Sequence, residues 1–487
     1  MRDRGERSRW ALVALLAALL LSLAMLAAAC GGDDEAGGGT DTAASGGGGT
    51  DTAATGGGGE GEPIKIGHLS NCEGPFAPFY DQTTGGAMLP FIERGAEASG
   101  KKGSDGVSGA TIAGRPVEFV FACSDSTPDV AVAEARRLVE EEGVDILVGP
   151  LSGDEGIAVA NYAKEHPDKT FINGIAGAQD ATLKVQAPNF FRYHPDGAQW
   201  SAGLGDYAYN ELGWKTAAII GDDYSFPYTS LAGFVAEYCA IGGQVTKRVW
   251  APLGEKDYSS YISQIPDDVD GIYVGIGGAG LVSFIKQYKQ QKGRVDTERM
   301  LGNVFWDDPL VLKEVGKDLV GGATSAMTAA DSDAPEVKEY IANLKESYGD
   351  EIAGFGPSVF TYGYYTAGRA LVKGLEAVSG DIADQAKLQE ALADVTLSGE
   401  EAPWGDVELD ENRQAISDVY VKKIVADKSG DGVPDVQTFR KISDVDQTFG
   451  GFFSPDSPEV SRNDPKCEKS DSPPPWVGNA EEVSFGK

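Results

Sequence analysis

Residues 144–152 read VDILVGPLS, and this stretch decides the fold. Its apolar part predicts a short buried strand over 146–149, and the Gly-Pro-Leu-Ser that follows predicts a loop before a helix. From Pro63 onward, short β-rich runs alternate with longer amphipathic stretches such as Val130 to Glu142, in which an apolar face is separated from a charged one. This alternation is typical of a parallel sheet wrapped by helices.

The pattern contains two series of strands. The first series is expected at 64–70, 117–122, 146–149, 171–174 and 190–193, and the second at 216–221, 245–250, 271–275 and 301–305. Each series has about the strand count of one doubly wound unit, and the right-handed crossover rule favours a flavodoxin-like strand order. We therefore predict an α/β fold with two similar doubly wound parallel-sheet lobes, whose ligands bind beyond the carboxyl ends of the strands.

The N-terminus is typical of a secretory signal. Residues 1–9 carry four arginines, and an apolar run from Trp10 to Ala29 follows and ends at Cys30. The segment LAAAC at 26–30 looks like a bacterial lipobox, which predicts a signal peptide over 1–29 and acylation of Cys30. The alternative is a transmembrane anchor, since 20 apolar residues can span a bilayer. Residues 30–62 predict a lipid-anchored flexible Gly/Thr-rich linker.

Charge and cysteine content narrow the class of protein. The formal net charge is −34, which argues against a nucleic-acid partner. Five cysteines are present, and acylation of Cys30 leaves Cys72, Cys123, Cys239 and Cys467. No C-x-x-C motif occurs, so we expect two disulfides in an exported protein, with three possible connectivities.

Several motifs are informative through their order and spacing: IKIG at 64–67, VDILVGPLS at 144–152, GWK at 213–215 through Asp222-Asp223, DYS at 257–259, and GDV at 405–407 with DEN at 410–412. Together they resemble the leucine/isoleucine/valine-binding (branched-chain amino acid) family of ABC-transporter solute-binding proteins, in its lipoprotein form. The resemblance extends from Ile64 to about Asp435.

The resemblance implies a type I periplasmic-binding-protein fold with three hinge crossings. The expected segments are 63–193 plus 327–402 for lobe 1, 194–326 plus 403–447 for lobe 2, and a C-terminal tail, 448–487, packed on lobe 2. The resemblance implies a monomer that binds a small amino-acid-like ligand by hinge closure and delivers it to an ABC transporter permease, outside the cytoplasm and anchored to the outer face of the cell membrane. It implies no cofactor and no catalysis; a sensory receptor and an exported enzyme on the same scaffold are the alternatives.

One end of the expected ligand is a carboxylate, which suits a helix N-terminus. Ser152 and Gly153 open the helix after the third strand, although Ser152 could be only an N-cap. The turn Ala176-Gly177-Ala178 matches the place where the family offers backbone groups to the ligand; the alternative is an ordinary turn.

The other ligand contacts are carried over by position. Asp307 matches the family's acidic residue, with Asp308 and Trp306 left open, and Phe226 and Phe76 are expected to contact the ligand side chain. Where the family has another aromatic residue, this chain has Gly277-Gly278, which predicts a wider pocket. Aliphatic and aromatic amino acids, aromatic acids, amides and urea all remain possible ligands.

The disulfide pairing follows from the expected strand order. Cys72 and Cys123 follow the first and second strands, which lie side by side, so a Cys72–Cys123 bond is expected. Cys239, on a helix of lobe 2, is then expected to pair with Cys467 in the tail.

Three further features of the sequence suggest cofactor binding, calcium binding or catalysis. GIGGAG at 275–280 matches a dinucleotide fingerprint, but it falls in the third βα unit of its lobe. Asp427, Ser429, Asp431 and Asp435 have the spacing of a calcium loop, yet the twelfth position is Thr438, and a plain turn is the expectation. His68, His166 and His194 are isolated in the sequence and match no catalytic motif.

Overall fold

The computed structural model describes residues 61–485. The expected signal peptide, the lipidated Cys30 and nearly all of the expected linker lie outside these residues. In the part of the chain that is described, no helix is both long enough and apolar enough to cross a membrane.

The first sheet belongs to lobe 1 and has the order β4-β5-β1-β6-β7-β8. Its parallel strands are β1 (Ile64–Asn71), β5 (Arg115–Ser124), β6 (Ile146–Val148), β7 (Thr170–Ile172) and β8 (Phe190–Phe191), and β4 (Thr111–Ile112) pairs antiparallel with β5. Counted along the chain, the parallel strands have the order 2-1-3-4-5. This is the predicted flavodoxin-like order.

The second sheet belongs to lobe 2 and repeats that order with β10-β9-β11-β12-β13. These strands are β9 (Thr216–Asp222), β10 (Gln244–Ala251), β11 (Gly271–Gly275), β12 (Met300–Gly302) and β13 (Ala323–Ala326). Four later strands extend the sheet in antiparallel fashion: β14 (Val407–Leu409), β15 (Ala415–Val425), β16 (Asp435–Val445) and β17 (Glu481–Glu482).

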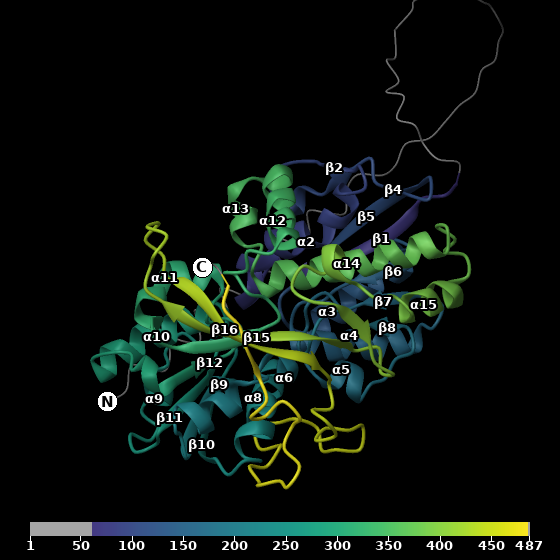
Figure 1. The fold of residues 1–487 in the computed structure, drawn as a ribbon. Helices are drawn as coiled ribbons and strands as arrows, with labels where there is room; N and C mark the ends of the chain where they lie inside the picture. Colours follow the sequence, from purple (N-terminus) through teal and green to yellow (C-terminus); the bar gives the residue numbers. More distant parts are fainter. Residues whose placement is uncertain (1–60, 486–487) are drawn as a thin grey trace, which may run out of the picture. The chain divides into compact units, whose positions relative to one another are not determined.

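Helices join the strands of each sheet and cover them (Figure 1). Between the strands of lobe 1 lie α2 (Tyr80–Ile92), α3 (Pro128–Arg136), α4 (Gly153–Glu165) and α5 (Asp180–Leu183). In the region of lobe 2 lie α6 (Gly197–Trp200), α7 (Leu204–Asp206), α8 (Ser225–Tyr238), α9 (Ser259–Ile262), α10 (Gly278–Lys292) and α11 (Pro309–Leu319). The expected helix over 130–142 is continuous in the chain, but its last turn is the π-helix η3 (Arg137–Glu141).

After β13 the chain returns to lobe 1 as four helices: α12 (Pro335–Tyr348), α13 (Asp350–Gly354), α14 (Val359–Ala377) and α15 (Gln385–Ala393). Helix α14 packs against α2, and the hydroxyl of Tyr364 on α14 donates to the carbonyl of Leu69 in β1 at 2.9 Å. Lobe 1 is therefore built from two separate parts of the sequence, which Figure 1 shows as the purple-to-blue and green segments. The remaining short elements are η1 (Gly74–Phe79), β2 (Glu97–Ala98), η2 (Gly103–Asp105), β3 (Val107–Ser108), η4 (Tyr207–Glu211), η5 (Thr297–Arg299) and η6 (Gly399–Glu401).

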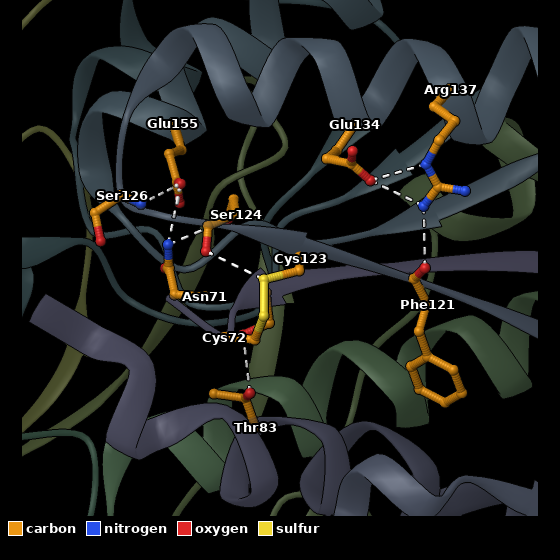
Figure 2. The surroundings of a disulfide bond; sticks show 11 residues. Asn71, Cys72, Thr83, Phe121, Cys123, Ser124, Ser126, Glu134, Arg137 and Glu155 are labelled. Atoms are coloured by element: carbon orange, nitrogen blue, oxygen red, sulfur yellow. Dashed lines mark hydrogen bonds and ion pairs between the residues drawn. A yellow bond between two sulfur atoms is a disulfide. The ribbon is translucent and has the colours of Figure 1, made fainter. Parts of the chain in front are cut away.

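Two disulfides are present, and they are the two expected pairs. Cys72 and Cys123 join the carboxyl ends of the adjacent strands β1 and β5, with a Cα–Cα distance of 5.3 Å. Figure 2 shows this bond beside Asn71 and Ser124, which lie one residue away on the same strands. The second bond joins Cys239, at the end of α8, to Cys467 in the tail.

The C-terminal tail contacts both lobes. Trp476 Nε1 donates to Glu237 of α8 at 2.6 Å, which fixes the tail to lobe 2 in addition to the disulfide. The ammonium of Lys184, which directly follows α5, also donates to the tail carbonyls of Ser454 (3.0 Å) and Pro455 (2.9 Å). The tail therefore contacts lobe 2 and also a side chain from the segment 63–193.

Candidate functional site

A small cavity lies where the carboxyl ends of the two sheets meet. In this closed conformation it measures about 20 Å³, enough for about one water molecule. No charged side chain is found among its lining residues, which are Phe76, Leu151, Ser152, Gly153, Ile175, Gly177, Trp200, Tyr224, Phe226, Val304, Phe305 and Phe360. A ligand of several heavy atoms therefore requires the lobes or these side chains to move apart.

Lobe 1 contributes the start of α4. Ser152 and Gly153 directly precede and begin this 13-residue helix, and both line the cavity. Ser152 is the N-cap residue of α4 and stands in a capping box with Glu155, yet its buried hydroxyl makes no hydrogen bond of regular geometry to any residue that the structure describes. Its N–H donates to Glu155 at 3.1 Å instead. The side chain of Ser152 is thus a free donor at the positive end of a helix dipole.

Glu155 holds the start of α4 in place through hydrogen bonds that its carboxylate accepts. Its carboxylate also accepts from Asn71 Nδ2 (3.1 Å) and from the N–H of Ser126 (2.9 Å), two contacts that are drawn in Figure 2. Burial raises the pKa of Glu155 to about 7, against the lowering effect of these hydrogen bonds. Since Glu155 is fully buried and is not among the lining residues, it shapes the loop rather than contacting a ligand.

The turn 176–178 has its middle residue at the cavity. Gly177 lines it, whereas Ala176 and Ala178 are buried behind it. A Cβ on Gly177 would lie 2.7 Å from the ring of Trp200 and 2.8 Å from the ring of Phe226, so only glycine fits between these rings. Within the described chain, neither the N–H of Gly177 nor that of Ala178 has a hydrogen-bond acceptor.

Lobe 2 presents a second helix N-terminus from the opposite side. Tyr224 precedes α8 and Phe226 lies in its first turn, and both line the cavity. A Cβ on Gly153 would lie 2.6 Å from Ser225 Oγ, so the starts of α4 and α8 are in direct contact. The N–H of Ser225 donates to Asp154 of lobe 1 at 3.0 Å, which ties the lobes together in this state.

Trp200 and Phe305 complete the lobe 2 side. Trp200 is buried and lines the cavity, and its indole N–H has no hydrogen-bond partner in the described part of the chain. Phe305 stacks on Phe76 of lobe 1, with ring centroids 6.0 Å apart, and packs edge-on against Phe226 at 6.1 Å. The two lobes therefore meet through aromatic rings around a small number of unpaired N–H and O–H donors.

The expected acidic ligand residue is not in the cavity. Asp307 forms a buried ion pair with Lys422 of β15, Asp308 caps α11 and accepts from Ser358, and Trp306 packs on Gly302 and Gly322 inside lobe 2. The physical reason is that β12 ends at Gly302, three residues before the expected end at 305. The chain then turns, with the Trp306 N–H bonded to Asn303 O at 3.0 Å, and Phe305 is presented instead.

The glycine at 277 does not widen the cavity in this conformation. A Cβ on Gly277 would lie 2.5 Å from the Phe305 ring, so the Phe305 ring fills the space beside this glycine. Gly277 does not line the cavity, and its N–H donates to Asp222 at 2.9 Å. In this conformation Pro75 and Phe76 of lobe 1 cover Gly278.

The other weighed motifs have structural explanations. In the loop between β15 and β16, Asp427 accepts the N–H groups of Gly430 and Gly432, and Asp435 accepts that of Ser429. Among residues 61–485 no group of three or more His, Cys, Asp or Glu side chains is arranged to hold a metal ion. Burial lowers the pKa of both His68 and His194 to about 3, which keeps these rings neutral.

Of the sequence-predicted residues, the structure brings Ser152, Gly153, Gly177, Phe226 and Phe76 together at one cavity. The sequence prediction did not name the other seven lining residues, which are Leu151, Ile175, Trp200, Tyr224, Val304, Phe305 and Phe360. A signal existed for Tyr224 and Phe305, because both stand near the carboxyl ends of expected strands, where ligands bind in this fold class. Trp200 and Phe360 lie on helices far from those strand ends in sequence, and only the fold places them here.

Two doubly wound lobes that together line a cavity are the architecture of the type I periplasmic-binding-protein fold. The model of the periplasmic binding protein family matches residues 63–431, and the chain belongs to that family. The family is one of binding proteins rather than enzymes.

Solved structures show the same fold. An ABC transporter substrate-binding protein from Sphaerobacter thermophilus is 24% identical, covers 79% of this chain and 99% of its own, and has a TM-score of 0.68. A solute-binding protein from Rhodopseudomonas palustris BisB5, in complex with 3,4-dihydroxybenzoic acid, is 23% identical, with 79% and 98% coverage and a TM-score of 0.68. A leucine-binding protein from Thermotoga maritima MSB8 is 22% identical, with 78% and 99% coverage and a TM-score of 0.64. No curated protein matches the sequence.

Proposed function

We propose that this protein is the extracytoplasmic solute-binding component of an ABC importer, and that it captures a small carboxylate with an aromatic or otherwise apolar body between its lobes. The observation that carries the proposal is the composition of the cavity wall: aromatic rings, two helix N-termini, unpaired donors and no charged side chain. Donors without a counter-charge are suited to an anion, and the rings are suited to an apolar body.

The carboxylate is expected at the start of α4. There the Ser152 hydroxyl, the N–H of Gly177 and the indole N–H of Trp200 are unpaired within the described chain and border the same cavity. Hydrogen bonds from these donors replace water around the anion, and the α4 dipole adds a favourable field. Phe76, Phe305 and their neighbours then enclose the rest of the ligand. The structure bound to 3,4-dihydroxybenzoic acid supports this class of ligand.

An amino acid is the second candidate, because the leucine-binding protein of Thermotoga maritima has the same fold. An ammonium group prefers an anionic or multiple-carbonyl partner when it is taken out of water. The residue expected to supply the anion, Asp307, is neutralised by Lys422 and lies outside the lining. For this reason the carboxylate without an ammonium group is the preferred ligand.

Binding is proposed to work by closure. The ligand contacts both lobes only when they are shut, so it shifts the population toward the closed form, which is the form a permease would recognise. Anchoring by an acylated Cys30 would hold the protein at the outer face of the membrane, with 30–62 as the tether.

The test is a thermal-shift panel on the purified protein with benzoate, 4-hydroxybenzoate, 3,4-dihydroxybenzoate, leucine, phenylalanine and urea. A ligand that binds only the folded state raises the unfolding midpoint. The proposal predicts a rise with at least one benzoate and none with leucine. A rise with leucine alone would favour the amino-acid candidate, and no response to any carboxylate would refute the proposed ligand class.

A further inference from the structure

A charged side chain is fully buried beside the ligand turn. Arg192 directly follows β8 and has no exposed surface. Its Nη1 donates to the carbonyls of Ala176 (3.1 Å) and Ala178 (2.6 Å), and its Nη2 donates to Thr182 Oγ1 at 2.7 Å. A planar guanidinium can satisfy several acceptors at fixed angles, which a lysine ammonium cannot do. Arg192 thus fixes both ends of the turn 176–178.

The same guanidinium is bonded to Gln414, which directly precedes β15 of lobe 2. Arg192 Nε donates to Gln414 Oε1, and the two residues also form a parallel β-bridge. Gln414 Nε2 in turn donates to the carbonyl of His194 at 2.8 Å. The carboxylate of Asp196 lies 3.6 Å from Nη2. Burial lowers the pKa of Arg192 to about 10, so the group stays protonated at neutral pH.

These contacts determine which groups of the turn remain free. The carbonyls of Ala176 and Ala178 are bonded to Arg192, and the carbonyl of Gly177 accepts from the N–H of Gly197 at 2.8 Å. The N–H of Ala176 is bonded to Asn173 Oδ1 at 2.8 Å. All three carbonyls are therefore engaged on the protein side, while the N–H groups of Gly177 and Ala178 have no acceptor in the described chain.

We propose that Arg192 is a positioning residue for ligand capture: it holds the carbonyls of Ala176 and Ala178 away from the cavity, so that the turn offers the N–H of Gly177 to the ligand, and it links the turn to lobe 2 through Gln414. Without the guanidinium, the peptide groups of the turn could rotate and present carbonyl oxygens, which repel a carboxylate. The inference rests on the proposed function in taking the cavity as the site of a carboxylate ligand.

The first experiment needs no ligand. Arg192→Met combined with Asp196→Asn removes the charge pair without leaving either charge buried alone. Asp196→Asn by itself is the comparison variant, because it shares the loss of the Asp196 carboxylate and keeps every hydrogen bond donated by Arg192. Asp180 and Asp410 remain as acidic neighbours of the guanidinium in this variant. We expect amide hydrogen exchange over residues 173–184 to be at least tenfold faster in the double variant than in the comparison variant, with β1 unchanged in both. Equal exchange in the two variants would overturn the proposal.

If the double variant does not fold, Thr182→Val tests the same role of Arg192 with a smaller change. It removes one acceptor of the guanidinium at nearly constant volume, and we expect exchange over 173–184 to rise about threefold. Exchange at the rate of the unaltered protein would refute the positioning role.

The second readout is the dissociation constant for 3,4-dihydroxybenzoate, measured by calorimetry. We expect it to be at least tenfold higher in the double variant than in Asp196→Asn, at equal unfolding midpoints. Equal affinity would refute the role of Arg192 in capture. If the unaltered protein binds no benzoate at all, the proposed ligand class fails, and the exchange experiment still decides the role of Arg192.

Discussion

The Ser152 hydroxyl gives the sharpest prediction, because a ligand-binding role and a structural role predict different effects of Ser152→Ala on the free energy of unfolding. Ser152 occupies the N-cap position of α4, and if its hydroxyl capped this helix through a regular hydrogen bond, Ser152→Ala would cost about 1 kcal/mol of stability. In the structure it is buried without a partner among the described residues, so its removal relieves a desolvated group. We therefore expect the free energy of unfolding of the unliganded variant to be unchanged or slightly higher.

The effect on affinity should be large. A hydrogen bond to a charged group contributes about 1.5–3 kcal/mol, which corresponds to roughly a 10- to 150-fold rise in the dissociation constant for a carboxylate. The assays are urea denaturation of the unliganded protein and calorimetric titration with the benzoate that gives the largest thermal shift.

The matched control is Asp384→Ala, since Asp384 caps α15 by accepting from the N–H of Lys387 and does not line the cavity. That variant should lose about 1 kcal/mol of stability and keep its affinity. The reasoning about Ser152 is refuted if Ser152→Ala destabilises the protein like the control while binding the benzoate as well as the unaltered protein does.

Three further predictions concern groups away from the cavity wall. Asp307→Asn leaves Lys422 buried without its anionic partner, so it should lower the free energy of unfolding, measured in urea, by about 3 kcal/mol. The affinity for the benzoate should be unchanged, and weaker binding at constant stability would contradict this prediction. Burial raises the pKa of Asp222 to about 7. Between about pH 4 and pH 7 the folded state therefore keeps a proton that the unfolded chain has released, so the free energy of unfolding falls as the pH rises. Asp222→Asn should reduce this dependence in thermal melts from pH 5 to 8, and a pH dependence equal to that of the unaltered protein would refute the prediction. Cys239→Ser with Cys467→Ser opens a bond between residues 228 positions apart and should cost up to about 5 kcal/mol; an unchanged melting midpoint would show that the bond does not limit unfolding.

The fold was accessible from sequence because its signals are local. Strands such as 64–71 and 146–148 are short apolar runs between helical patterns, and the right-handed crossover rule leaves few ways to order them. The same order placed Cys72 beside Cys123. The tail gave no comparable signal, since the contacts of Lys184 with the carbonyls of Ser454 and Pro455 join distant residues through backbone atoms.

The site was accessible only in part. Ser152 and Gly177 stand in strand-end loops, which the fold class alone directs to the ligand. Asp307 was expected at the cavity because the sequence predicted a strand that ends at 305, whereas β12 ends at Gly302. A shift of one residue along a strand already turns a side chain to the other face of the sheet. Trp200 lies on a four-residue helix after the first crossing, and nothing in the local sequence marks it as part of a pocket.

The measurement that tests the central claim most directly is a crystal structure of the protein with the benzoate that gives the largest thermal shift. The account predicts a carboxylate within hydrogen-bond distance of Ser152 Oγ and the N–H of Gly177, with the ring between Phe76, Phe226 and Phe305. A carboxylate bound elsewhere, or a bound amino acid whose ammonium contacts an acidic side chain in the cleft, would contradict it.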